Sequence, residues 1–106
     1  MFPYSSVSAS STYREKIVSQ IEVVSANIAN ANTTRTPEGG PYKKKSIYCS
    51  NSECTYDEEL DVILTYNPSH IDADVNGYVA SPNIDVADEM DKMIQLQELY
   101  EQNLSN

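Results

Sequence analysis

Apolar residues recur at intervals of four and three near both ends of this chain, and this spacing most limits the folds open to it. Near the start, the series consists of Ile17, Ile21, Val24, Ile28 and Ala31. Such spacing is typical of a helix that packs along one narrow seam. We therefore predict a helix over about residues 8–33, capped by Ser10 and Ser11. An isolated helix of this kind is marginal in water, so its seam needs a partner.

A second series of the same spacing occupies the C-terminal part of the chain. Its members are Val86, Met90, Met93, Gln97, Tyr100 and Leu104. Asp85, followed three residues later by Asp88, approximates a capping box and predicts the helix start. Ile94, Leu96 and Leu99 widen the apolar stripe of this second predicted helix.

The segment between the two predicted helices reads as short strands joined by turns. The sequence "PEGGPY" (37–42) is a clear helix breaker. Residues 43–49 and 60–66 are strand candidates, the second being richer in β-branched and aromatic residues. The polar, acidic residues 51–59 are interpreted as a loop, and a short extended piece is predicted at 78–80.

These elements predict an α+β fold. N- and C-terminal helices form an antiparallel-type, coiled-coil-like assembly unit, either with each other or with helices of other subunits, around a small β-rich insert. The chain divides into an N-terminal helix with an Asn/Thr-rich exit (1–36), the insert and its turn (37–83), and a C-terminal helix (84–106).

The charge of the chain is strongly asymmetric. Its net charge is −9, with +3 in residues 1–50 and −12 in residues 51–106. The acidic half repels nucleic acid and anionic lipid, so neither is an expected partner. No window approaches a membrane span, and residues 1–13 lack the basic start and apolar run of a cleaved signal peptide.

One turn partly matches a calcium-binding loop. Asp72, Asp74 and Asn76 occupy positions 1, 3 and 5 of an EF-hand pattern, but Asn83 replaces the Glu required at position 12. An Asx-rich turn is the favoured interpretation. The alternative function that follows from the loop is a small acidic protein-binding module, calcium-dependent through residues 72–83.

No arrangement of residues typical of catalysis is visible. His70 is the single histidine and has no nucleophile suitably placed in the sequence. Cys49 and Cys54 are interpreted as two free thiols or one local bridge, and do not make a convincing metal set. We therefore predict no enzyme activity, and no catalytic, cofactor-binding or metal-binding residues.

The run "NIANANTTRT" (27–36) places amides and hydroxyls at the end of the first predicted helix. Asn27, Asn30 and Thr34 share one helical stripe. A buried amide fixes the register of packed helices, whereas Asn and Thr also suit a fraying helix end. Both interpretations stay open on the residues alone.

Four stretches together resemble the bacterial flagellar rod, hook and hook-associated axial proteins, and among them the proximal-rod family called basal-body rod protein C. They are "SANIANANTTRT" (25–36), "GGPYKKK" (39–45), "YNPSHIDADVNGYVASPNIDVADEM" (66–90) and "LYEQNL" (99–104). The third stretch is the most specific, and the resemblance extends over nearly the whole chain, residues 7–104.

The resemblance implies a structural subunit of the axial drive shaft in the flagellar basal body, exported by the type III apparatus without a cleaved signal. Its implied partners are other rod subunits and basal-body or export-gate proteins, in homo- and hetero-oligomeric assembly without direct membrane insertion. The C-terminal helix is short for such a family. The predicted assembly interface comprises Ile17, Ile21, Val24, Asn27, Ile28, Asn30, Ala31, Thr33, Thr34, Val86, Met90, Met93, Gln97, Tyr100 and Leu104.

Overall fold

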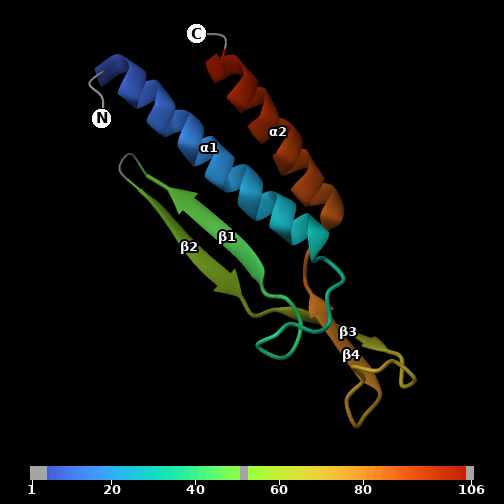
Figure 1. Ribbon diagram of the computed structural model, residues 1–106. Helices are drawn as coiled ribbons and strands as arrows, with labels where there is room; N and C mark the ends of the chain where they lie inside the picture. Colours follow the sequence, from blue (N-terminus) through green and yellow to red (C-terminus); the bar gives the residue numbers. More distant parts are fainter. Residues whose placement is uncertain (1–4, 51–52, 105–106) are drawn as a thin grey trace.

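Two helices flank four short strands in the computed structural model, which describes residues 5–50 and 53–104 (Figure 1). The elements are α1 (Ser5–Ala29), β1 (Lys44–Cys49), β2 (Cys54–Glu59), β3 (Val62–Tyr66), β4 (Tyr78–Pro82) and α2 (Val86–Leu104). The α+β class with terminal helices and a small β insert is thereby confirmed. Side-chain environments are described for residues 13–50 and 53–103, so the predicted interface side chain of Leu104 lies outside them.

The two helices lie side by side and run in opposite directions (Figure 1). At one end, Arg14 Nη1 donates a hydrogen bond to the carbonyl oxygen of Asn103. At the other end, Asn27 Nδ2 donates to Glu89 Oε1. In the described part of the chain, neither helix has an apolar stretch long enough to cross a membrane.

The strands form two separate antiparallel pairs. In the first sheet, β1 pairs with β2 so that Lys44 lies opposite Glu59. In the second, β3 pairs with β4 so that Tyr66 lies opposite Tyr78. The β1–β2 hairpin extends along α1, and the β3–β4 hairpin lies beyond the C-terminal end of that helix (Figure 1).

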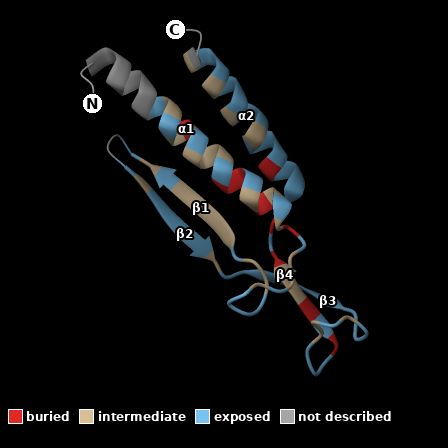
Figure 2. Ribbon diagram, viewed as in Figure 1, coloured by how far each residue is buried: buried red, intermediate tan, exposed pale blue. Residues whose placement is uncertain are grey.

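The core is small and follows the inner side of α1 and the strand that leads into α2 (Figure 2). Its buried apolar residues are Ile17, Val23, Val24, Ala31, Val79 and Ile84. The molecule measures 59 × 24 × 17 Å, and its Cα radius of gyration is 17.9 Å, against about 13 Å for a compact chain of this length. The chain is therefore an elongated plate.

The prediction of a loop over residues 51–59 was wrong, because Cys54–Glu59 forms β2. The acidic composition of this segment suggested a solvated loop. In the hairpin, however, Glu58 and Glu59 lie opposite Lys45 and Lys44, and opposite charges across a ladder stabilise the pairing. A disulfide joins Cys49 and Cys54 next to the hairpin turn, which resolves the open alternative in favour of a local bridge.

The predicted start of the first helix was also wrong. The helix begins at Ser5, so Ser10 and Ser11 lie within it and not at its cap. The capping prediction for the second helix is confirmed, since Asp85 Oδ1 accepts hydrogen bonds from the backbone N–H groups of Ala87 and Asp88. Asp85 therefore satisfies N–H groups that otherwise have no partner at a helix start.

Candidate assembly interface and its supporting junction

Asn27 is the centre of a junction that joins α1, β1 and α2. Its side chain is only 1% exposed. The Nδ2 atom donates to the carbonyl oxygen of Lys45 at 2.9 Å and to Glu89 Oε1 at 3.2 Å. The Oδ1 atom accepts from the backbone N–H of Lys45 at 2.9 Å and from the hydroxyl of Tyr42 at 3.0 Å. Every donor and acceptor position of the amide is used, so this residue fixes three elements at once.

Glu89 places a buried carboxylate at the same junction. It is 1% exposed and lies on the α2 side of Asn27. Its Oε2 atom is 3.0 Å from Lys92 Nζ, one turn further along α2, and 4.0 Å from Lys44 Nζ on β1. A buried charge is tolerated only where such partners offset its desolvation. The site therefore requires α2 in one position relative to β1.

Tyr42 closes the junction at the edge of β1. Burial raises the pKa of its hydroxyl above the ordinary value, and the nearby carboxylates of Glu58 and Glu89 raise it further. The hydroxyl thus stays protonated and donates to Asn27. The ammonium of Lys45 lies 5.7 Å from the centre of the Tyr42 ring, within the range of a cation–π interaction.

The residues after α1 connect its end to the turn before β4. Asn30 Nδ2 donates to the carbonyl oxygen of Ala26 at 2.9 Å, and Thr33 Oγ1 donates to Asn30 Oδ1 at 3.0 Å. Asn30 and Thr33 therefore serve the helix exit, whereas Asn27 is a packed interior amide. The two interpretations of the Asn/Thr run each describe part of it.

The last residues of this exit segment bind the side chain of Asp72. Thr34 Oγ1 donates to Asp72 Oδ2 at 2.8 Å, and the Arg35 guanidinium binds Asp72 Oδ1. Hydrogen bonds from Thr34 and then from Arg35 hold the pKa of the Asp72 carboxyl below its usual value. The turn is thus tied to the end of α1 by a charged contact.

The acidic turn gives the calcium-dependent alternative no support. Asp72 binds Thr34 and Arg35, as described above. Asp74 Oδ1 accepts from the backbone N–H groups of Asn76 and Tyr78 at 2.9 Å each, which makes an Asx turn. Within residues 5–50 and 53–104, no group of three or more His, Cys, Asp or Glu is arranged to hold a metal ion.

The predicted interface residues of α1 and of the exit segment after it lie mostly inside the chain. Four are buried and five are half-buried against neighbouring elements. The buried ones are Ile17, Val24, Asn27 and Ala31, and the half-buried ones are Ile21, Ile28, Asn30, Thr33 and Thr34. The seam of α1 is thus largely occupied by the chain's own β1 and α2.

The predicted seam of α2 is only partly occupied by the chain itself. Met93 and Tyr100 are half-buried, whereas Val86, Met90 and Gln97 are exposed. The sequence pattern did not predict that Glu89 is buried, because an acidic residue within an apolar stripe is normally assigned to the surface. Its signal was the spacing of Glu89, Met93, Leu96 and Tyr100 at intervals of four, three and four.

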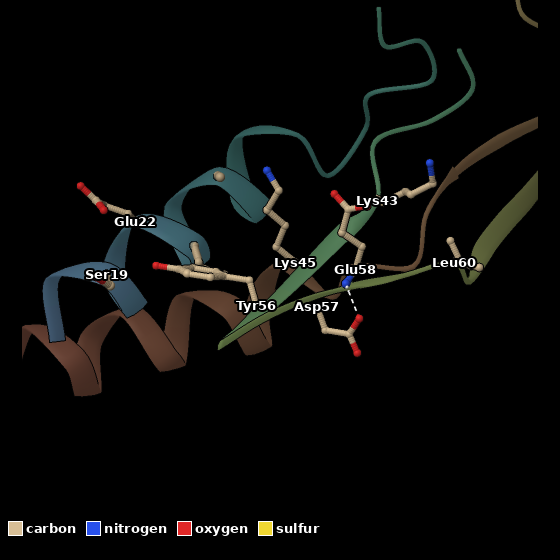
Figure 3. A pocket seen from close by; sticks show the side chains of 10 residues that line it. Ser19, Glu22, Lys43, Lys45, Tyr56, Asp57, Glu58 and Leu60 are labelled. Atoms are coloured by element: carbon tan, nitrogen blue, oxygen red, sulfur yellow. Dashed lines mark hydrogen bonds between the residues drawn. The ribbon is translucent and has the colours of Figure 1, made fainter. Parts of the chain in front are cut away.

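A hollow of about 890 Å³ lies between α1 and the β1–β2 hairpin (Figure 3). Ser19, Glu22 and Ala26 line it from α1, while Tyr56 extends from β2 toward that helix. Its lining mixes acidic, basic and apolar side chains. No residues in it form a nucleophile–base pair or a metal set within the described part of the chain.

Two family models match this chain in regions that coincide with its helices. A model described as "Flagella basal body rod protein" matches residues 18–35, which cover the second half of α1 and its exit. A model described as "Flagellar basal body rod FlgEFG protein C-terminal" matches residues 75–105, which cover β4 and α2. Both matched regions include contacts of the Asn27 junction.

Similar proteins from several bacteria share most of the chain. The flagellar basal-body rod protein FlgC of Borreliella burgdorferi is 31% identical, over 94% of this chain and 85% of that protein. This chain belongs to the FlgC family of flagellar basal-body rod proteins. FlgC of Agrobacterium fabrum is 34% identical over 80% of this chain and 70% of its own length, and FlgC of Bacillus subtilis is 29% identical over 93% and 83%.

Membership of the FlgC family agrees with the resemblance found in the sequence. The alignment with the Borreliella protein spans 129 positions, more than the 106 residues of this chain, so that relative carries extra residues within the aligned region. The relatives are structural rod proteins of the flagellar basal body. Assembly with other rod and basal-body components is implied for the family as a whole.

Proposed function

We propose that this chain is a structural subunit of the flagellar basal-body rod, placed in its proximal part and built into the axial drive shaft through its terminal helices. FlgC relatives that cover most of the chain support the rod assignment. Proximal position, type III export without a cleaved signal, and contact with export-gate proteins follow from the family resemblance. No catalytic role is proposed.

The proposal rests on two observations: the chain is elongated, and several of its apolar side chains are exposed to solvent. Its solvent-accessible area is 7225 Å², against about 5,900 Å² for a compact protein of this mass. Val86, Met90 and Ile94 of α2 are 38%, 53% and 54% exposed. We infer that a partner covers these exposed apolar side chains, which recur at every fourth position of α2.

The predicted interface residues then have two roles. Those that stay accessible, chiefly Val86, Met90 and Gln97, contact neighbouring subunits. Those buried in the chain, such as Ile17, Val24 and Asn27, hold the two helices in the arrangement that neighbours recognise. The helix pair is thus the assembly unit, and the insert with its disulfide braces it from one side.

Complementation with altered surface residues tests this function. The double variant Val86→Asp/Met90→Asp is expressed in a strain whose own copy of the gene is deleted. We expect loss of motility and absence of the protein from purified basal bodies, because charge cannot be buried in an apolar contact. The matched control is Ile71→Asp/Val75→Asp, which makes the same chemical change in an exposed turn.

The control should swim and assemble like the wild-type chain. Circular dichroism of both purified variants checks that the helices persist, since all four substituted side chains are exposed. Normal rods in the Val86→Asp/Met90→Asp strain would contradict assembly through α2. A wild-type chain that is absent from basal bodies would contradict the rod function itself.

A further inference from the structure

The exposed side of α2 carries an apolar stripe that its own chain leaves uncovered. Lys92, Gln95, Leu96 and Leu99 line the hollow that α2 shares with β1. Because successive residues of a helix are rotated by about 100°, Val86, Met90 and Ile94 lie on the far side of α2 from that hollow. Apolar residues four apart on one helix are the anchors by which helices recognise each other.

Acidic side chains border this stripe along its length. Asp91 and Glu98 are exposed and seven residues apart, so they lie on one line beside Met90 and Ile94. Neither carboxylate takes part in an ion pair within the described residues. A partner that covers Met90 and Ile94 must therefore face two uncompensated negative charges.

Five cations of the chain make internal contacts, and none of the ion pairs described above involves this border. Arg35 binds the carboxylate of the 72–74 turn, and Lys44 and Lys92 lie beside the buried carboxylate of α2. Arg14 donates to a carbonyl oxygen at the end of α2, and Lys45 lies over a tyrosine ring. The border formed by Asp91 and Glu98 therefore stays acidic.

A second copy of this chain is a poor occupant for the stripe. On α1, Glu15 and Glu22 are exposed and also seven residues apart, and Glu22 borders the hollow beside the β1–β2 hairpin. The α2 helix of another copy would bring Asp91 and Glu98 itself. Either helix would place like charges opposite each other, which disfavours the contact.

We propose that the exposed side of α2, with the stripe of Val86, Met90 and Ile94 bordered by Asp91 and Glu98, docks a basic amphipathic helix of a different polypeptide. This inference rests on the proposed rod function and specifies the class of partner. The partner supplies apolar residues at intervals of three and four, flanked by Lys or Arg on the side that meets Asp91 and Glu98. Charge then selects a heterotypic neighbour over self-association.

Two synthetic peptides of equal length serve as probes. Both are helical and present the same leucine stripe; one has lysine and arginine along its flank, and the other has glutamate. Each is titrated into the full, disulfide-bonded chain by calorimetry, and amide shifts map the contact. We expect the basic peptide to bind along residues 86–98, with affinity that falls as salt rises, and the acidic peptide not to bind.

Charge reversal at the border separates specific docking from general attraction to an acidic protein. The variant Asp91→Lys/Glu98→Lys should bind the basic peptide about tenfold more weakly and accept the acidic one. The matched control, Glu15→Lys/Glu22→Lys, has the same spacing and the same change in net charge on α1. It should keep the preference for the basic peptide.

Three results would overturn the inference. They are equal binding of the two peptides, equal loss in the control variant, and self-association of the wild-type chain that Met90→Asp abolishes. The rod function is judged separately by complementation. If Asp91→Lys/Glu98→Lys assembles normally while Val86→Asp/Met90→Asp does not, the charge selection fails and the rod function stands.

Discussion

At the scale of single residues, Asn27 does more than the sequence pattern indicated. The Asn/Thr-rich run pointed to this region, and helical spacing placed Asn27 on one stripe with Asn30 and Thr34. The pattern could not identify Tyr42 and Glu89 as partners of Asn27, because they lie 15 and 62 residues away in the chain. Such contacts depend on how the hairpin and α2 fold back onto α1.

Asn27→Ala tests the junction directly. The change leaves the backbone N–H and carbonyl of Lys45, the hydroxyl of Tyr42 and one oxygen of Glu89 without their partner. We expect the free energy of unfolding to fall by about 3 kcal/mol, since each buried group left unsatisfied is costly. Urea denaturation followed by circular dichroism measures the change.

Asn32→Ala is the control for that experiment. Asn32 lies in the same run but is exposed, so we expect a change within about 0.5 kcal/mol. Similar costs for the two variants would mean that the hydrogen bonds of Asn27 contribute little. A double-mutant cycle with Glu89→Gln then isolates the coupling between the two side chains.

Gly77 and Gly39 form a second matched pair. Both have positive φ, 90° and 95°, so alanine strains the backbone at either position. At Gly77 an added Cβ would lie 2.7 Å from Tyr66 Cε1, whereas nothing lies within 4 Å at Gly39. We expect a loss of about 1 kcal/mol for Gly39→Ala and about 3 kcal/mol for Gly77→Ala. Thermal melts compare them, and equal losses would exclude a steric role for Tyr66.

At the scale of elements, the sequence predicts what is local and periodic. Both helices, the strands at 43–49 and 60–66 and the cap at Asp85 were predicted because each depends on neighbouring residues. The β2 strand was missed because its acidic side chains become favourable only opposite the lysines of β1. The buried side of α2 was assigned incompletely, because Glu89 gains its place from residues of α1 and β1.

The contact between the exit of α1 and the 72–74 turn should depend on pH. The folded pKa of Asp72 is lowered, so its contribution to stability is full above the unfolded pKa of about 4. It is lost as the pH falls through the lower folded value. We expect Asp72→Asn to melt at a lower temperature than the wild-type chain at pH 7. This difference in melting temperature should close once the pH is below the folded pKa of Asp72.

Melting temperatures from pH 7 to pH 2 provide this comparison. Glu38→Gln is a suitable control, because Glu38 lies in the exposed turn after α1. Its profile should follow the wild-type chain throughout. A gap for Asp72→Asn that persists unchanged at pH 2 would show that the lost contact does not depend on the carboxylate charge.

At the scale of the whole molecule, the chain leaves much of its apolar surface exposed to solvent. An elongated plate with two separate two-stranded sheets buries few side chains, and isolated two-stranded sheets are only marginally stable in water. The junction, the disulfide and the Asp72 contact each join segments that a large core would otherwise hold. Under the proposed function, assembly into the rod would cover the remaining apolar surface.

Small-angle X-ray scattering of the isolated chain tests this shape. We expect a radius of gyration near the 17.9 Å of the Cα atoms, with a slightly larger value from hydration. A compact collapse would give about 13 Å, and an unfolded chain of this length about 33 Å. A value near 13 Å would mean that the apolar stripe of α2 is covered within the monomer.

The fully used amide of Asn27 also has a consequence for how such chains diverge. A polar residue at the surface is readily substituted, because water replaces the hydrogen bonds that are lost. Asn27 has none to spare, and its partners lie on two other elements. Substitutions at positions 27 and 89 should therefore arise together across lineages, so that the two helices evolve as one unit.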